Sequence, residues 1–130
     1  MDRLYTVTEL ATELGITPRT IRFYETKGLL SPKRAGTTRV YGHRDRARMQ
    51  LILRGKRLGF SLADIKEYLD LYTADTSHVE QIHLLLKKVR DRLGGLEAQR
   101  REVEATIAEL GEIESLASAA LKEKAGGGEM

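Results

Sequence analysis

Several side chains that suit nucleic-acid binding lie close together in the sequence TPRTIRFY. Arg19 carries a planar fork of N–H donors that matches O6 and N7 of guanine, whereas Arg22 and Tyr24 suit phosphate contacts that hold a register. Thr17 and Thr20 stand where a helix would begin, and the N–H groups of a helix N-terminus also suit a phosphate. These residues predict a recognition helix. The alternatives are a solvated helix face for the two arginines and a half-buried core ring for Tyr24.

A second group of candidate contacts follows in SPKRAGTTRVY. Lys33 and Arg34 are basic, and they either contact nucleic acid or solvate a loop. Arg39 and Tyr41 are two apart, so an extended segment would place them on the same side. Arg57 lies in RGKR, which either clamps a phosphate or solubilises the end of a helix.

The charge of the chain is divided unevenly. Residues 1–60 carry 13 Lys and Arg against 5 Asp and Glu, a balance of +8, whereas residues 61–130 carry 9 against 14, a balance of −5. The two parts give the net charge of +3. A basic first part indicates a polyanion-binding head, although patchy surface charge alone would look similar.

Two short helices are predicted to position the first cluster. Thr6 and Glu9 form a capping box at the start of TVTELATEL, and Gly15 ends that helix. Thr17 is the N-cap of the next helix, and Pro18 fits its first position. A helix-turn-helix results. Within its second helix, we expect Ile21 and Phe23 to face the core.

The next segments are predicted to be a hairpin and two further helices. Pro32 excludes a central strand, and Gly36 is the expected turn between two short extended arms that form a wing. Helical spacing resumes from Met49 to Leu58. Ser61 is the predicted N-cap of a fourth helix, with Asp64 as its capping partner. This helix is expected to bury the apolar side chains Leu62, Ile65, Leu69 and Tyr72.

Apolar residues then recur in steps of three and four, which is typical of a coiled coil. A helix over residues 76–121 would be roughly 65–70 Å long, too long to bury this seam against so small a head. We therefore predict a homodimer held by Ile82, Leu86, Val89, Leu93, Leu96, Val103, Ile107 and Leu110. The predicted organisation is a DNA-binding domain at 1–74, a dimerisation helix at 75–121 and a disordered tail at 122–130. The predicted fold is mainly α: a winged helix-turn-helix head followed by a long coiled-coil helix.

The strings YTVTELATELGITPRTIRFYETKGLL, RVY and LGFSLADIKEYL, followed by the long heptad helix, resemble the MerR family of bacterial transcription regulators from about Leu4 to Leu121. The resemblance implies antiparallel pairing of the long helices, which places two heads on a palindromic double-stranded promoter. It also implies that bound DNA is bent and untwisted, which realigns the elements read by RNA polymerase. Arg19, Arg22 and Tyr24 match the family's recognition-helix contacts, and Arg39 and Tyr41 match its wing contacts.

The segment GTTRVYGHRDRARMQLILRGKRLGFSLADIKEYLDLY is similar to the LiuR type within that family. This similarity implies control of branched-chain amino-acid or fatty-acid catabolism, with a small metabolite such as an acyl-CoA as effector. Metal and redox sensors of the family use cysteines, and drug or cobalamin sensors carry a large C-terminal domain. This chain has no cysteine, and the sequence stops after the long helix.

Other functions find less support in the sequence. The absence of cysteine excludes disulfides and thiolate metal sites. No membrane span or signal peptide is predicted, so we expect a cytoplasmic protein. No catalytic constellation and no cofactor loop is visible, so we expect neither an enzyme nor a cofactor. His78 and His83 are five apart and fall on different helix faces, which disfavours a metal site even with Glu80 nearby. The remaining alternative is a coiled-coil interaction protein whose basic head binds RNA or another acidic partner.

Overall fold

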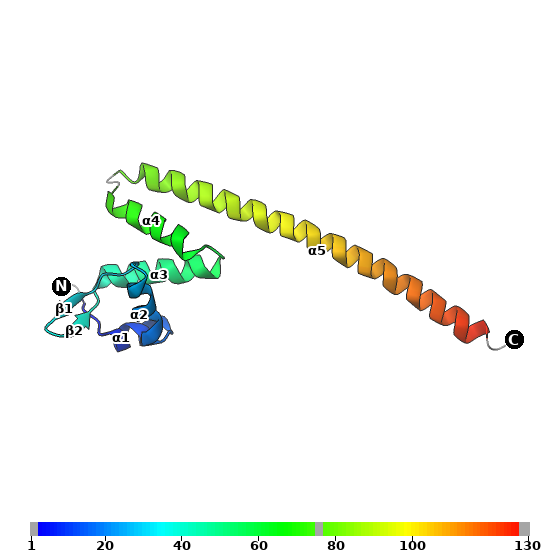
Figure 1. The fold of residues 1–130 in the computed structure, drawn as a ribbon, viewed down its shortest axis with the longest axis horizontal. Coiled ribbons are helices and arrows are strands. Elements are labelled where there is room, and N and C mark those ends of the chain that lie inside the picture. The colour runs from blue at the N-terminus through cyan, green and yellow to red at the C-terminus, as the bar shows by residue number, and fades with distance from the viewer. Residues whose placement is uncertain (1–2, 75–76, 128–130) are drawn as a thin grey trace. The chain divides into compact units, whose positions relative to one another are not determined.

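The computed structural model describes residues 3–74 and 77–127, and it is mainly helical (Figure 1). In these described ranges, five helices and one two-stranded hairpin follow in the order α1, α2, β1, β2, α3, α4 and α5. The chain forms two compact units, one up to Lys88 and one from Val89. The predicted fold class, a winged helix-turn-helix head followed by a long helix, is confirmed.

The first helix, α1 (Val7–Leu14), begins and ends as predicted. The backbone N–H of Glu9 donates to Thr6 Oγ1 at 3.1 Å, and the N–H of Thr6 donates to Glu9 Oε1 at 2.8 Å. Gly15 terminates the helix with a φ of 71°, a left-handed conformation that glycine adopts without a Cβ clash. The turn to the next helix is therefore fixed by local sequence.

The second helix, α2 (Pro18–Thr26), has Thr17 as its N-cap and proline in its first turn, as predicted. Its core-facing residues are Ile21 and Tyr24, which are both buried. Phe23 is 47% exposed, so the expectation that it faces the core is wrong. At 3.6 residues per turn, the face that buries Ile21 also takes the residue three positions later, not the one two positions later.

The predicted hairpin is present. Strands β1 (Lys33–Ala35) and β2 (Thr38–Val40) are antiparallel, with Lys33 opposite Val40 and Arg34 opposite Arg39. Gly36 lies in the connecting turn with a φ of 66°. Directly after β2, Tyr41 forms a backbone bridge with Tyr5, with N–O distances of 2.7 and 2.8 Å. The base of the hairpin is therefore attached to the segment that precedes α1.

Helices α3 (His43–Arg57) and α4 (Leu62–Ala74) complete the head. Ser61 caps α4 as predicted, since its Oγ accepts the N–H of Asp64 at 3.0 Å. Ile65 and Leu69 are buried and Leu62 packs at the edge of the core, whereas Tyr72 is 54% exposed, so its predicted burial is wrong. The largest fully buried side chains of the core are Tyr41, Leu10, Ile21, Leu29, Met49 and Ile52.

The last helix, α5 (Val79–Gly127), extends further than predicted. Residues 122–127 are helical, so the expected disordered tail is wrong there, and residues 128–130 lie outside the described part. Gly94 and Gly95 do not interrupt the helix. The head also extends beyond residue 74, because the start of α5 contacts α4. Gln81 Nε2 donates to the carbonyl oxygen of Tyr68 at 3.0 Å, and Lys88 Nζ lies 2.7 Å from Asp64 Oδ1 and 3.1 Å from Glu67 Oε2.

Most of the predicted heptad seam is exposed to solvent in the single chain, and Val89 is half-buried. From residue 99 to residue 126 every side chain of α5 is exposed, and large apolar residues such as Val103, Ile107 and Leu110 are more than half exposed.

None of the described helices combines the length and apolar composition that a membrane span needs.

Candidate nucleic-acid interface

The outward face of α2 carries exposed, charged and polar side chains. Helical periodicity turns Arg19, Arg22, Phe23 and Thr26 away from the buried Ile21, and all four are exposed. Within residues 3–74 and 77–127, neither arginine has an ion-pair partner. Their guanidinium groups are therefore available to a ligand on this face.

The two threonines at the start of α2 bind each other. Thr17 Oγ1 lies 2.9 Å from Thr20 Oγ1 and also accepts the backbone N–H of Thr20 at 3.2 Å. The hydroxyl of Thr17 thus accepts one of the unpaired backbone N–H groups at the start of α2. The other N–H groups of the first turn keep the partial positive charge that favours an anion.

The two predicted tyrosine contacts lie in the core. Tyr24 is buried, which agrees with the alternative of a core ring, and its ring and that of Phe23 form an edge-to-face pair with centroids 5.4 Å apart. Tyr41 has no exposed surface, so the expectation that it reaches DNA is not supported. Alternation did place Arg39 and Tyr41 on one side of the strand, but that side faces α2.

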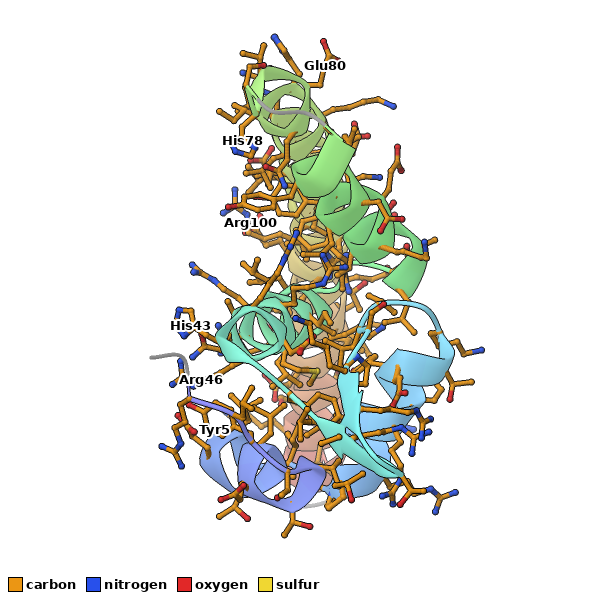
Figure 2. All side chains as sticks on the ribbon, turned by 90° about the vertical axis from the view of Figure 1, so that its left-hand side faces the viewer. Tyr5, His43, Arg46, His78, Glu80 and Arg100 are labelled. Carbon is orange, nitrogen blue, oxygen red and sulfur yellow. The ribbon has the colours of Figure 1, made fainter. Side chains whose placement is uncertain are left out.

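A carboxylate of α2 joins these wing residues. Arg39 Nε donates to Glu25 Oε1 at 2.9 Å, and the hydroxyl of Tyr41 donates to Glu25 Oε2 at 3.3 Å (the hairpin lies beside α2 in Figure 2). The hydrogen bond that Arg39 donates to Glu25, together with the negative charge of that carboxylate, raises the pKa of Arg39. Burial, with the nearby negative charge of Glu25, raises the pKa of Tyr41 to about 12.

The remaining predicted contacts are exposed cations. Lys33 and Arg34 lie on β1, and Arg57 is the last residue of α3. In the described ranges, none of these three has an ion-pair partner. Arg54 and Lys56 share the last turn with Arg57, where cations also compensate the helix dipole.

Two features of this surface, the role of Glu25 and the exposure of Phe23, differ from the sequence-based prediction. Glu25 received no role, although an acid within a strongly basic stretch signals a specific partner. Phe23 was assigned to the core, yet it is exposed with the ammonium of Lys27 lying 5.6 Å from its ring centroid. The helical period counted from Ile21 is the sequence signal that separates them, because it places Tyr24 on the buried face and Phe23 off it.

The histidines form no visible metal centre. In Figure 2, His78 and Glu80 lie at the α4–α5 end of the head, far from His43 on α3. The ring of His78 stacks on Tyr72 with centroids 4.7 Å apart. Among the described residues, no group of three His, Cys, Asp or Glu side chains could hold a metal ion.

A helix-turn-helix with a basic two-stranded wing defines the class of winged helix-turn-helix DNA-binding proteins. The comparisons with known proteins agree. The family model described as "MerR HTH family regulatory protein" matches residues 5–72 of this chain, and the model described as "MerR, DNA binding" matches residues 46–113. The chain belongs to the MerR family of DNA-binding transcription regulators and is not an enzyme.

Relatives with assigned names cover most of the chain. The mercuric resistance operon regulatory protein of Pseudomonas fluorescens is 38% identical over 111 residues, which cover 81% of this chain and 73% of the relative. The HTH-type transcriptional regulator ZntR of Escherichia coli K12 is 33% identical over 109 residues, which cover 82% and 71%.

Two solved structures are also similar. HiNmlR, a MerR family regulator lacking the sensor domain and bound to promoter DNA, is 29% identical with a TM-score of 0.56, covering 96% of this chain and 92% of that one. A MerR family structure from Listeria monocytogenes shares the fold, with a TM-score of 0.73 at 20% identity over 92% of both chains.

Proposed function

We propose that this chain is a homodimeric regulator that binds a palindromic promoter and controls transcription by distorting the DNA. The observation that carries this proposal is that Arg19 and Arg22 are exposed on the outward face of α2, beside a basic hairpin, with no ion-pair partner among the described residues. The similarity to HiNmlR supports it, since that regulator lacks a sensor domain and is bound to promoter DNA.

The individual contacts follow from side-chain chemistry. Arg19 reads a guanine through its two parallel donors, and Arg22 holds a phosphate. The first turn of α2, with Thr17 and Thr20, receives another phosphate. Further phosphate contacts come from exposed cations of the wing and of the end of α3: Lys33, Arg34 and Arg57. Arg39, Tyr24 and Tyr41 support this surface from beneath, because they are bonded or buried within the head.

The dimer is proposed from the exposed seam of α5. A contiguous apolar stripe on a single chain marks a protein–protein interface. The stripe from Leu93 to Leu110 repeats in steps of three and four, with Arg100 as its one charged position, and this spacing suits a second copy of the same helix. Antiparallel pairing of two such helices would set two heads on the two halves of a palindrome.

The effector is proposed to be a small metabolite, with LiuR-type targets in branched-chain amino-acid or fatty-acid catabolism. The similarity of residues 36–72 to that group supports this assignment. We do not propose mercury as the effector, although a mercuric regulator is similar to this chain. Soft metals select thiolate ligands, and this chain has no cysteine.

Selection from a randomised duplex library tests the proposal. The wild-type chain should enrich a palindrome, and log K should fall by about 0.9 per log unit of salt for each phosphate neutralised. Arg19→Ala should relax base preference at one position in each half-site, costing about 1–3 kcal/mol of discrimination. Arg34→Ala, a matched loss of one cation, should weaken binding to all sequences alike. Equal losses on every sequence for both variants would refute the assignment of Arg19. Tighter binding to RNA than to duplex DNA in a parallel binding assay would favour the alternative function.

A further inference from the structure

The one acid within α2's last turn lies where a DNA-binding surface should avoid negative charge. Residues 17–27 contain Arg19, Arg22 and Lys27, and Glu25 opposes their attraction for phosphate. Glu25 does not point freely to solvent, because its side chain is only 20% exposed and both carboxylate oxygens are bonded to the wing. Its geometry therefore suggests a purpose other than solubility.

The hairpin has little else to hold it. Each strand has three residues, and a two-stranded hairpin is marginally stable on its own. All three residues of β1 are exposed, and those of β2 are exposed or half-buried. The backbone bridge between Tyr41 and Tyr5 fixes only the base. Above that base, the side-chain contact that the structure describes between the hairpin and α2 is the bond from Arg39 to Glu25.

The strength of this contact comes from charge and partial burial. A charged donor and a charged acceptor make a shorter and stronger hydrogen bond than neutral groups do, and 2.9 Å is within that range. The side chain of Arg39 is 37% exposed, so water screens the pair only in part. The second oxygen of Glu25 meets the hydroxyl of the buried Tyr41, which limits how the carboxylate can rotate.

We propose that Glu25 is a positioning residue for DNA recognition. By accepting hydrogen bonds from Arg39 and Tyr41, it holds the hairpin against α2, and we call this contact the latch. Helix and wing then contact the duplex as one rigid surface. Arg39 then acts mainly by orienting the wing, and the phosphate contacts of the wing fall to Lys33 and Arg34. The effect on DNA rests on the proposed function, whereas the effect on the hairpin does not.

The first test uses the free, full-length chain without DNA. Amide hydrogen exchange of residues 33–40 should become about tenfold faster in Glu25→Ala than in the wild type, because the hairpin opens more often. Glu13→Ala is the matched control, since Glu13 also pairs with an arginine between two elements, Arg46 at 2.7 Å, but does not contact the wing. Unchanged exchange at residues 33–40 in Glu25→Ala would overturn the latch.

The ion pair itself is tested by exchanging its charges. Glu25→Arg and Arg39→Glu should each loosen the hairpin, and the double variant should recover part of the protection because the pair is restored in reverse. If the effects of the two substitutions simply add, the latch does not act through this pair.

The second test measures DNA recognition. It compares binding to a palindromic duplex selected by the wild type with binding to a random-sequence duplex. In Glu25→Ala the ratio of the two affinities should fall about tenfold, while binding to the random duplex is equal or tighter because a negative charge is lost. A ratio equal to that of Glu13→Ala contradicts the inference. If the wild type shows no preference for any duplex, the proposed function fails, and the exchange measurement still decides whether the latch exists.

Discussion

At the scale of single residues, the two arginines of α2 contrast with the cations of the head that form ion pairs. Arg39, Arg46 and Lys66 are held by carboxylates, whereas Arg19 and Arg22 are exposed and unpaired within the described chain. A cation without an internal partner contributes little to folding. We infer that these two positions serve the ligand.

Replacement of Arg19 by lysine separates charge from geometry. Arg19→Lys keeps the positive charge but loses the planar fork, so base discrimination should fall by about 1–3 kcal/mol while the salt dependence stays unchanged. Competition between the selected duplex and variants at each position measures this loss. A wild-type pattern of discrimination in Arg19→Lys would show that the fork does not read a base.

Tyr41 should make the stability of the head fall at alkaline pH. Its pKa is about 12 in the folded chain against 10.0 for an ordinary tyrosine, so above pH 10 the unfolded chain releases this proton first. The free energy of unfolding should therefore decrease as the pH rises from 10 to 12. Urea denaturation should show a shallower decrease for Tyr41→Phe, and identical slopes for both proteins would contradict the assignment.

The residue types of the interface were predictable, but the side to which each points was only partly so. The 3.6-residue period of α2 places Tyr24, and not Phe23, on the face of the buried Ile21, whereas hydrophobicity alone favours burial of Phe23. The outcome depends on what packs above Tyr24, and that contact comes from other parts of the chain. The same holds for Tyr41, whose burial depends on Tyr5 and Glu25, both distant in sequence.

At the scale of elements, short-range signals located the helix ends well. Thr6, Gly15, Thr17 and Ser61 act as predicted because a cap needs only neighbours within three residues. The end of α5 was predicted too early, since lysine and alanine in LKEKAGG are good helix formers and the sequence has no proline there. The junction of α4 with α5 required a tertiary contact that periodicity does not show.

The contact between α4 and α5 includes the ion pairs of Lys88 with Asp64 and Glu67. These ion pairs should make the stability of the α4–α5 junction sensitive to acid. The hydrogen bond from Lys88 lowers the pKa of Asp64 below 3.8. The stabilisation is therefore complete above the unfolded value of 3.8 and is lost as the pH falls through the lower folded value.

Lys88→Met should destabilise the head by up to about 1 kcal/mol at pH 7, because the pair is partly exposed, and should have a smaller effect at pH 3. Urea denaturation at the two pH values measures both. An equal loss of stability at pH 3 and pH 7 would show that Lys88 acts through packing and not through these carboxylates.

At the scale of the whole molecule, α5 carries more apolar surface than its own chain covers. Ile107, Leu110 and Leu116 are each at least 60% exposed. Exposure of such large apolar side chains to water is unfavourable in free energy. The sequence already predicted the seam from its spacing. It could not predict how the seam is covered, because that depends on a second molecule.

A charge in the seam should separate the two copies. Val103→Asp should convert a dimer to a monomer and lower affinity for the palindrome by more than 100-fold, roughly the gain that joining two half-site contacts provides. Ala105→Glu places the same charge on the opposite side of α5 and should leave mass and affinity near those of the wild type. Light scattering and gel shifts measure the two properties, and a Val103→Asp protein that stays dimeric would exclude this seam.

The most direct test of the account is sedimentation equilibrium of the full chain, alone and with the selected palindromic duplex. A homodimeric regulator should sediment as a particle of twice the chain mass without DNA, and two chains should bind each duplex when DNA is present. A single chain at micromolar concentration in both samples, or a dimer that leaves the duplex unbound at low salt, would contradict it.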